Sequence, residues 1–334
     1  METRVGKILI LAFILCLLWM PISQSCAAAL DNRQMISINI TGDVLLGRWV
    51  ERALNIVGVE GVMKGVAPVF RSADYTMINL ECPVTDIVSS AKKSHVFRAD
   101  PSLLKGLRSV GVTHAVLANN HTLDQGDAGF IDTVRNLAKA GIEAVGVAKG
   151  NPETVSPEII EKDGIKIAVF AVNMIKVSSQ VRKPSEIGPC EASEEDMRAY
   201  VRSFHVLHPE VHVIVFLHWG EEYSLFPTEE QTAFAHALID AGAAAVIGCH
   251  PHVIQGVEVY HGRPIAYSLG NLLFDQDLPE TQTGLIITLV FGQDSMTGVT
   301  LHKVRQINAA PHLAGEMKLD LSIDRMILPS GLFP

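Results

Sequence analysis

The sequence has 334 residues, of which 48% are hydrophobic, and a formal net charge of −9 at pH 7. A chain of this length and composition can bury one large core or two smaller ones. The negative charge and the lack of a basic run argue against a nucleic-acid-binding surface. After residue 29 the chain has three cysteines, Cys82, Cys190 and Cys249, which are too few for a disulfide-based fold.

Residues 1–29 have the three parts of a secretory signal peptide. Arg4 and Lys7 precede an apolar run at residues 8–20, and small residues follow it. The run is short for a bilayer span, so we expect a signal peptide, with an uncleaved N-terminal anchor as the alternative. Cys26 would be the lipidation site of a lipoprotein, but the residues before it match the usual Leu-Ala-Gly poorly. The segment predicts an exported protein that is periplasmic or on the cell surface.

The first part of the remaining chain alternates between predicted strands and helices. The predicted strands are apolar without clean alternation, which indicates burial on both faces. In chain order we expect a strand at 35–40, a helix at 49–56, a strand at 75–80, a helix at 102–110, a strand at 115–118, a helix at 130–140, a strand at 165–172, a helix at 194–204, a strand at 211–217, a helix at 229–241 and a strand at 243–247.

Beyond residue 252 the pattern changes to closely spaced strands with hairpin-like turns. These strands are expected at 257–260, 264–269, 284–291 and 299–307. Alternating strands and helices followed by a run of strands indicate mixed sheets covered by helices. Because no linker-like stretch divides residues 30–334, we predict one domain of the α/β class, built as a layered sandwich.

Five of the predicted strands end in polar residues of metal-binding type. These residues are Asp43, Glu81, Asn120 with His121, His218, and His250 with His252. In open α/β sheets the loops beyond the carboxyl ends of the strands gather at one edge, where ligands bind. Carboxylate, amide and imidazole ligands together suit Mn, Fe or Zn. Because a mononuclear zinc site needs only three or four protein ligands, this larger set, with six candidates even without His121, indicates two ions bridged by one carboxylate.

Each candidate has an ordinary explanation when it is considered alone. Asp43 can be a turn or helix-capping residue, Glu81 a surface charge and Asn120 part of a turn. His218 follows an apolar run and can be a core histidine. The recurrence of such residues at five strand ends is what favours a metal site.

The sequence Gly248-Cys249-His250-Pro251-His252 carries two of the candidate ligands with one residue between them. We expect Gly248 to allow a sharp turn at the strand end, so that both imidazoles reach one ion or two neighbouring ions. Cys82 and Cys249 also lie beside candidate ligands. Buried packing is the favoured role for both thiols, and metal ligation is the alternative.

Six short motifs in this order resemble the poly-γ-glutamate capsule biosynthesis family (CapA type), a branch of the calcineurin-like metallophosphoesterases. The motifs are Thr41-Gly42-Asp43, Asn79-Leu80-Glu81, Ala118-Asn119-Asn120-His121, His218-Trp219-Gly220, Gly248-Cys249-His250-Pro251-His252 and Ser268-Leu269-Gly270-Asn271. The resemblance extends over about residues 36–280. It implies a four-layer α/β/β/α sandwich with a dinuclear metal centre between the two sheets.

The resemblance also implies a role for each matching residue. The implied metal ligands are Asp43 and His252 for the first ion, Asn120, His218 and His250 for the second, and Glu81 as the bridge. His121 matches the histidine that protonates the leaving group, and Asp124 is expected to orient its ring. Arg48 is expected to bind a substrate carboxylate or phosphate, and Asn271 to support the site by hydrogen bonding. For Asp124 a turn and for Arg48 a solvated surface position are the alternatives.

Two positions depart from the metallophosphoesterase pattern. The first motif of that pattern is Asp-x-His, but Leu45 stands at the histidine position here. The bridging position carries Glu81, which is longer than the usual aspartate by one methylene. Both departures weaken the first site, so we predict two divalent ions, one of which binds poorly or only with substrate.

Three functions agree with these residues. The favoured one is a metal-dependent hydrolase of capsule or envelope polymer that acts through metal-activated water on an anionic polymer or a phosphoester. The second is a non-catalytic assembly or anchoring factor that works with the components of a membrane polyglutamate synthase. The third is a general exported phosphoesterase. None of the three involves a nucleic acid.

Overall fold

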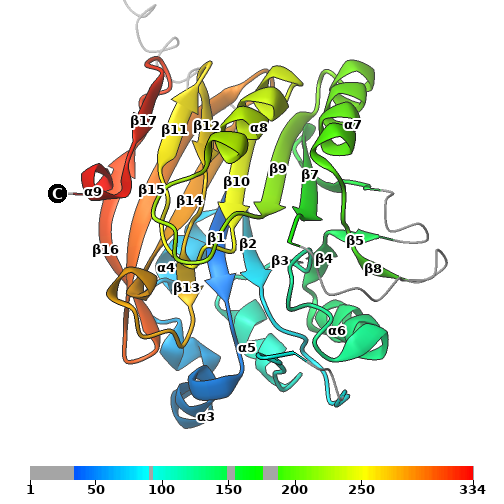
Figure 1. Ribbon diagram of the computed structural model, residues 1–334, viewed down its shortest axis with the longest axis vertical. Helices are drawn as coiled ribbons and strands as arrows, with labels where there is room; N and C mark the ends of the chain where they lie inside the picture. Colours follow the sequence, from blue (N-terminus) through cyan, green and yellow to red (C-terminus); the bar gives the residue numbers. More distant parts are fainter. Residues whose placement is uncertain (1–33, 90–92, 149–154, 176–186, 334) are drawn as a thin grey trace, which may run out of the picture. The chain divides into compact units, whose positions relative to one another are not determined.

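The computed structural model describes residues 34–89, 93–148, 155–175 and 187–333 (Figure 1). All the elements named below belong to one compact unit that begins at Met35. The predicted signal segment, residues 1–29, lies outside the described residues.

The first sheet has the strand order β16-β15-β14-β1-β2-β3-β4, and β13 pairs with β1 as well. Strands β1 to β4 pair with one another in parallel, and β13 pairs with β1 in parallel, whereas the pairs β1–β14, β14–β15 and β15–β16 are antiparallel. The strands are β1 (Ile36–Val44), β2 (Tyr75–Leu80), β3 (His114–Val116), β4 (Glu143–Val145), β13 (Asn271–Leu273), β14 (Thr283–Phe291), β15 (Met296–Ile307) and β16 (Ala310–Lys318).

The second sheet has the strand order β17-β11-β12-β10-β9-β7-β6, with a parallel centre from β12 to β7. Its strands are β6 (Glu158–Lys162), β7 (Ile165–Asn173), β9 (His212–His218), β10 (Ala245–Cys249), β11 (Val257–Tyr260), β12 (Arg263–Ala266) and β17 (Arg325–Ile327). A separate short ladder pairs β5 (Val147–Ala148) with β8 (Gly188–Pro189).

The helices divide into two groups, one for each sheet. The first sheet is covered by α3 (Arg48–Val62), α4 (Ala67–Ser72), α5 (Leu103–Ser109) and α6 (Gly126–Ala140). The second is covered by α7 (Glu194–Leu207), capped by Ser193, and α8 (Glu229–Asp240), which begins with a capping box at Thr228. Two single turns, η1 (Pro279–Gln282) and α9 (Pro329–Leu332), complete the helices of the described residues.

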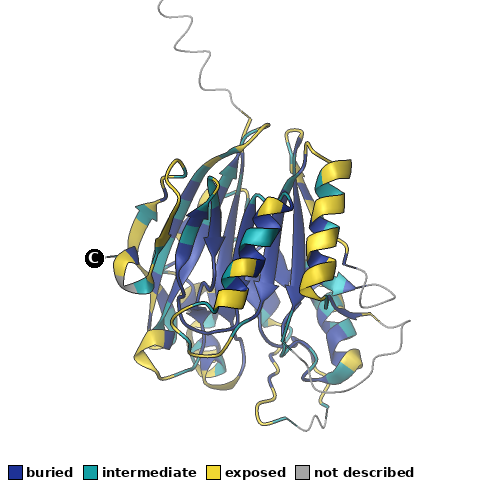
Figure 2. Ribbon diagram, turned by 45° about the horizontal axis from the view of Figure 1, so that its top comes forward, coloured by how far each residue is buried: buried dark blue, intermediate teal, exposed yellow. Residues whose placement is uncertain are grey.

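Three hydrophobic cores separate these layers. One lies between the first sheet and its helices, one between the two sheets, and one between the second sheet and its helices. In Figure 2 the strands are largely buried, and the exposed residues gather on the outer sides of helices. The arrangement is an α/β/β/α sandwich, which confirms the predicted four-layer fold.

Strand β7 shows why the strands lack a clean polar alternation. Ile165, Ile167 and Val169 face the core between the sheets, whereas Ala168 and Phe170 face the helices. Successive side chains point to opposite faces, and here both faces are buried. A near-continuous apolar run is therefore the expected sequence of such a strand.

The parallel strands bring the predicted site residues to one edge. In Figure 1 the arrowheads of β1, β2, β9 and β10 point the same way, toward the lower edge of the view. The polar residues predicted from the sequence lie at or just after the carboxyl ends of these strands and of β3. The fold thus places the two sheets' carboxyl ends where one site can draw residues from both.

Several element boundaries differ from the predicted ones. β1 extends to Val44, so that Asp43 lies within the strand rather than after it, and β10 ends at Cys249. α3 is longer than predicted because two helices join across a kink at Gly58. Ten further elements were not predicted from the sequence, namely α4, β4, β5, β6, β8, β13, η1, β16, β17 and α9.

Within the described ranges, every helix is too short or too polar to cross a membrane.

Candidate metal centre

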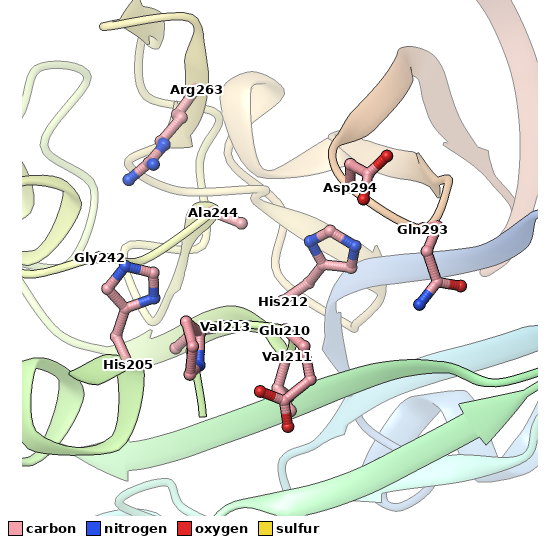
Figure 3. Close-up of a pocket in the computed structure, with 11 residues that line it drawn as sticks. His205, Glu210, Val211, His212, Val213, Gly242, Ala244, Arg263, Gln293 and Asp294 are labelled. Atoms are coloured by element: carbon pink, nitrogen blue, oxygen red, sulfur yellow. The ribbon is translucent and has the colours of Figure 1, made fainter. Parts of the chain in front are cut away.

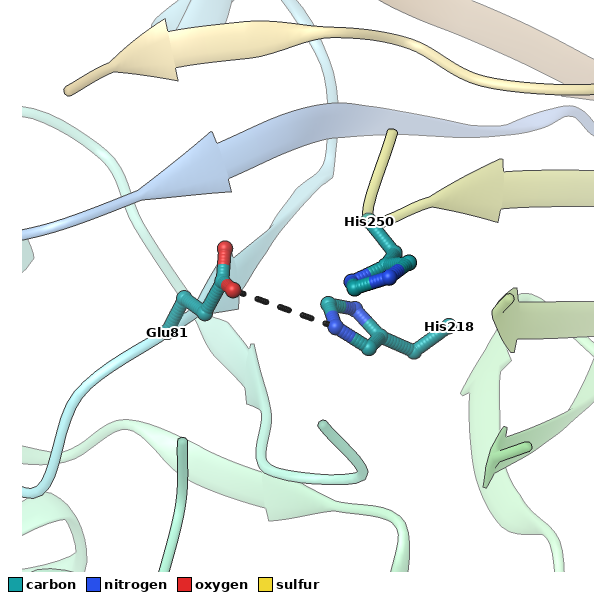
Figure 4. Close-up of side chains that lie close together, drawn as sticks. All are labelled: Glu81, His218 and His250. Atoms are coloured by element: carbon teal, nitrogen blue, oxygen red, sulfur yellow. Dashed lines mark ion pairs between the residues drawn. The ribbon is translucent and has the colours of Figure 1, made fainter. Parts of the chain in front are cut away.

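Two groups of buried side chains meet between the sheets, and Glu81 belongs to both. One group consists of Asp43, Glu81 and His252, and the other of Glu81, His218 and His250. The ligand atoms of each group lie within 4.8 Å of one another. Figure 4 shows the carboxylate of Glu81 directed toward the rings of His218 and His250. A single carboxylate therefore lies within reach of two sets of ligands.

The distances between these side chains are short enough for strong electrostatic interaction. Oδ2 of Asp43 lies 3.1 Å from Nδ1 of His252. Oε1 of Glu81 lies 3.8 Å from Nε2 of His252 and 3.9 Å from Nε2 of His218. The side chains of Asp43, Glu81 and His218 are fully buried, and that of His252 is 3% exposed.

An irregularity in β1 places Asp43 at the site. The pairing of β1 with β2 shifts register between Ile40 and Asp43, as in a β-bulge. Bulges of this kind redirect side chains and are frequent beside active sites. Asp43 is held by Asn79, whose Nδ2 donates to Oδ1 at 2.6 Å, and by the N–H of His250 at 3.4 Å.

The backbone of the loop after β10 directs both of its histidines inward. His250 and His252 have φ angles of 100° and 60°, in the left-handed region that residues other than glycine rarely adopt. Each such residue costs on the order of 1–3 kcal/mol and persists where the surrounding structure fixes it. This strained loop lets two residues on either side of Pro251 reach two different groups of ligands.

Gly248 has a different role from the one predicted. It lies inside β10, and its φ is not positive. A Cβ atom at this position would lie 2.0 Å from the carbonyl oxygen of Tyr267 and 2.5 Å from Nε1 of Trp219. The glycine is therefore required for the close approach of these groups, and the turn is made by the histidines themselves.

Burial controls the protonation of the second group. It lowers the pKa of His218 well below the usual value, helped by the neighbouring histidines, and lowers that of His250 to about 4. Both rings are therefore neutral near pH 7, as a metal ligand must be.

The protonation of the first group, Asp43, Glu81 and His252, differs from that of the second. Burial raises the pKa of Glu81 well above its usual value, against the attraction of His252. Burial also acts to lower the pKa of His252, but the carboxylates of Glu81 and Asp43 outweigh it and raise the value to about 9. Without a metal, these three side chains therefore hold at least one proton near neutrality.

The polar atoms at the centre fit divalent cations. Both carboxylate oxygens of Glu81 and Nδ1 of His250 are buried and have no hydrogen-bond partner among the described residues. A buried polar atom without a partner costs about 1–3 kcal/mol, and more when it is charged. A cation between these atoms would satisfy them, and the mixture of carboxylate, imidazole and amide donors is one that Mn, Fe and Zn accept.

Asn120 and His121 lie where the sequence placed them, after β3. Oδ1 of Asn120 lies 2.9 Å from Nε2 of His218, beside the second group of ligands. Nδ1 of His121 lies 2.7 Å from Oδ2 of Asp124, whose side chain is fully buried. The ring of His121 stacks on Phe97 with the ring centroids 3.9 Å apart. Asp124 thus fixes one ring nitrogen and leaves Nε2 available.

Two asparagines that the sequence analysis did not single out support the site. Nδ2 of Asn79 contacts Nδ1 of His218 at 3.2 Å as well as Asp43. Asn119 donates to Oδ1 of Asn79 and to the carbonyl oxygen of Leu80, and its own Oδ1 accepts from the N–H of His121. Their only sequence signal was their place in the motifs beside Glu81 and His121.

Arg48 and Asn271 have contacts that bear on their predicted roles. Nε of Arg48 pairs with Oδ2 of Asp275 at 3.0 Å, and its guanidinium lies 5.2 Å from the centre of the Phe97 ring. It begins α3 with a φ of 56° and is not a freely solvated arginine. Oδ1 of Asn271 lies 3.0 Å from Nδ1 of His252. Asn271 therefore contacts a candidate ligand directly.

Neither group of candidate ligands includes Leu45, Cys82 or Cys249. Leu45, at the position of the missing histidine, is packed in the core beneath the helices of the first sheet. Cys82 and Cys249 are buried outside both ligand groups. Burial raises the pKa of the Cys82 thiol to about 12 and that of Cys249 well above its usual value. Both thiols are protonated near pH 7, in agreement with a packing role.

A cavity of about 240 Å³ lies at the opposite ends of the same strands. It is lined by His205, Pro209, Glu210, Val211, His212, Val213, Gly242, Ala244, Arg263, Gln293 and Asp294, most of which are labelled in Figure 3. None of the lining residues belongs to a group of three candidate metal ligands in the described part of the chain. The metal centre is therefore the stronger candidate for the functional site.

Comparison with known sequences agrees with this geometry. The sequence model of the bacterial capsule synthesis protein PGA_cap matches residues 37–276, which contain every candidate ligand. The chain is 30% identical over 274 residues to the PGA biosynthesis protein CapA of Bacillus subtilis, covering 81% of this chain and 71% of that protein. It is 28% identical to a probable polyglutamine synthesis accessory protein of Mycobacterium tuberculosis, covering 74% and 76% of the two chains.

Comparison with solved structures shows the fold. A hypothetical protein from Thermus thermophilus aligns with a TM-score of 0.51 and 16% identity, covering 81% of this chain and all of that one. The NAD nucleotidase of Haemophilus influenzae aligns with a TM-score of 0.50 and 11% identity, covering 86% of this chain and 60% of that one. The fold is of the metallophosphoesterase type.

Proposed function

The chain belongs to the bacterial capsule synthesis protein family, and from this membership and the metal centre we propose that it is a metal-dependent hydrolase of capsule or envelope polymer. One observation carries the proposal. Glu81 is common to two groups of ligands, and both of its oxygens are buried without a hydrogen-bond partner among the described residues. A carboxylate in this state fits a bridge between two cations better than any role within the metal-free protein.

The two ligand groups define two proposed ion sites. Asp43, Glu81 and His252 would hold one ion, and Glu81, His218 and His250, with Asn120 beside them, would hold the other. Ions held in this way act as Lewis acids and lower the pKa of water toward neutrality. Manganese, iron and zinc all accept these donors.

The side chains themselves supply proton transfer and orientation. Oδ2 of Asp124 accepts a hydrogen bond from Nδ1 of His121 and fixes the ring. Nε2 can therefore deliver a proton to the leaving group. Arg48, held by Asp275, would bind an anionic group of the substrate next to Phe97 and His121. Burial of Asp124 strengthens its interaction with His121 because water screens it little, whereas the Arg48 side chain is 35% exposed and is partly screened.

Substrate, partner and location are proposed from the names of relatives, the fold and the N-terminal sequence. The relative from B. subtilis is named for PGA biosynthesis, and we extend an anionic polymer substrate and membrane synthase partners to this chain. A phosphoester is the other substrate class, since the fold is of the metallophosphoesterase type. We also propose that the chain is exported, from the pattern of residues 1–29.

The second candidate is a non-catalytic assembly factor. The relative from M. tuberculosis is named an accessory protein, and Leu45 stands where the metallophosphoesterase pattern has a histidine. In that case the bound metal would stabilise the fold or help to bind the polymer, and no substrate would be turned over.

Replacement of His121 separates the two candidates. The metal-loaded protein and a His121→Asn variant are assayed on poly-γ-glutamate, p-nitrophenyl phosphate and bis(p-nitrophenyl) phosphate. A hydrolase should lose about 10²–10⁴-fold in kcat with its metal content unchanged, because His121 is outside both ligand groups. His261→Asn, at an exposed histidine, should keep full activity.

Two results would contradict the hydrolase. One is full activity in His121→Asn, and the other is a metal-loaded wild-type protein that turns over none of the three substrates. The second result, with metal still bound, would favour the assembly factor.

A further inference from the structure

The carboxylate of Asp124 is fully buried and accepts from three donors. Its Oδ2 lies 2.7 Å from Nδ1 of His121 and 2.8 Å from the N–H of Phe97, and its Oδ1 accepts from Nζ of Lys93 at 2.8 Å. A buried carboxylate is tolerated when it is paired and hydrogen-bonded in this way. Lys93 contributes the only ammonium group among these three donors.

Lys93 also contacts the backbone of the loop that carries the site. Its Nζ donates to the carbonyl oxygen of Asn120 at 2.9 Å, and its side chain is 23% exposed. One ammonium group therefore joins the main chain at Asn120 to the carboxylate of Asp124. These two residues flank His121 in the sequence, so the ammonium closes the loop around the histidine.

The segment that carries Lys93 supports His121 in two further ways. The N–H of Phe97 fixes the same oxygen of Asp124 that His121 contacts, and the Phe97 ring stacks on the imidazole at an interplanar angle of 20°. Asp124 is also near enough to act electrostatically on Glu81. Lys93 therefore neutralises a negative charge that would otherwise add to the two carboxylates of the metal centre.

We propose that Lys93 is a positioning residue for His121, acting through the Asp124 carboxylate and the Asn120 carbonyl oxygen. Its effect on turnover rests on the proposed hydrolase function, but its effect on the His121 ring does not. The proposal assigns to this lysine the task of keeping the imidazole in one orientation, with Nδ1 on Asp124 and Nε2 facing the substrate.

The ring itself provides a test that needs no turnover. In the full chain loaded with Zn²⁺, which is diamagnetic, and with ¹⁵N-labelled histidine, the Nδ1–H resonance of His121 is assigned by its absence in His121→Asn. We expect Lys93→Met to lose this resonance, because the loosened carboxylate lets the proton exchange with water. Lys93→Arg should keep it, and Lys139→Met, at an exposed lysine of α6, should match the wild type. An unchanged resonance in Lys93→Met would overturn the proposal.

Kinetics provide the second test if the protein proves to be a hydrolase. Lys93→Met should lower kcat about 10-fold with KM and metal content unchanged, and Lys93→Arg should recover most of the loss. If Lys93 acts through Asp124, the double variant with Asp124→Asn should be no slower than Asp124→Asn alone. Losses that multiply in the double variant would refute this. If the wild type turns over no substrate, the hydrolase proposal fails and the resonance alone decides the role of Lys93.

Discussion

Glu81 and His252 are buried side by side and together hold at least one proton near neutrality. The pKa of His252 is raised to about 9 because the carboxylates of Glu81 and Asp43 outweigh the effect of burial. The pKa of Glu81 is raised well above its usual value by burial. A cation that binds between them has to displace at least one proton, because these ligands bind metal in their deprotonated forms.

We therefore predict that metal binding tightens as pH rises toward about 9, the pKa of His252. Between pH 6 and pH 8 the apparent affinity for Mn²⁺ should increase about tenfold per unit for each proton released. Calorimetry in Hepes and in Tris measures the protons directly, since the two buffers differ in ionisation enthalpy. Equal binding enthalpies in the two buffers would contradict the prediction, and so would an affinity that falls as pH rises.

Arg48 provides a test of substrate charge at the scale of one residue. Its Nε is paired with Asp275, so the two Nη groups can form a fork for a carboxylate or phosphate. Arg48→Gln should raise the dissociation constant for inorganic phosphate about 10-fold in the metal-loaded protein, since one charged hydrogen bond contributes about 1.5–3 kcal/mol.

Arg52→Gln is the matched control for Arg48. Arg52 lies one turn further along α3 and stacks on the exposed ring of Trp49 at 3.7 Å. Its removal should change phosphate binding by less than twofold. Equal effects of the two substitutions would show that general charge, and not a fixed guanidinium, attracts the anion.

The residues that the sequence predicted for the site do meet, but their supports could not be predicted. Asp43, Glu81, His218, His250 and His252 were identified because their side chains are metal ligands and recur at strand ends. The supports Asn79 and Lys93 have side chains that are common in turns and on surfaces. Their contacts depend on the packing of distant segments, which no local pattern encodes.

At the scale of elements, the contact between β1 and β13 depends on glycines. A Cβ atom on Gly42 would lie 1.9 Å from the carbonyl oxygen of Gly270, and Gly270 has a φ of 64°. Because the obstructing atom belongs to the backbone, a side chain at residue 42 must move β13. That strand carries Asn271, which contacts His252.

Gly42→Ala should therefore lower the free energy of unfolding by about 1–3 kcal/mol, the usual cost of overpacking. It should also weaken metal binding, because Asp43 is the next residue in β1. Urea denaturation and metal analysis measure the two effects. Gly298→Ala in β15 is the control, since a Cβ there meets only Val290 at 3.9 Å. A Gly42→Ala protein as stable as this control would argue against a tight β1–β13 contact.

The long apolar strands could be predicted from the sequence, whereas the strands at the edges of the sheets could not. β7 and β9 have near-continuous apolar runs because both of their faces are buried. β16, at an edge of the first sheet, has mostly exposed side chains and no hydrophobic pattern. Asp43 was expected after a strand because Thr41 and Gly42 resemble a turn, but the pairing partners β2 and β13 extend β1 through them.

At the scale of the whole molecule, the proposed centre joins the two sheets. Asp43 and Glu81 come from the end of the first sheet, and His218, His250 and His252 from the end of the second. Ions held by both sets therefore stabilise the packing of the two sheets as well as the site.

Removal of metal should consequently lower the stability of the entire sandwich. At a free Mn²⁺ concentration of 100 times the dissociation constant, each bound ion should add about 2.7 kcal/mol to the free energy of unfolding. Urea denaturation with and without EDTA measures this difference. His250→Ala with His252→Ala should show no response to EDTA. Identical midpoints for the wild-type protein in the two conditions would indicate that metal does not link the sheets.

The most direct test of the account is the metal content of the purified protein beside the variant with His250→Ala and His252→Ala. A centre bridged by Glu81 predicts close to two equivalents of Mn, Fe or Zn in the wild type, and loss of both ions in the variant. Close to one equivalent would show that the first site, without a histidine at Leu45, is too weak to retain its ion. No metal in either protein after supplementation would contradict the dinuclear centre and with it the proposed hydrolase.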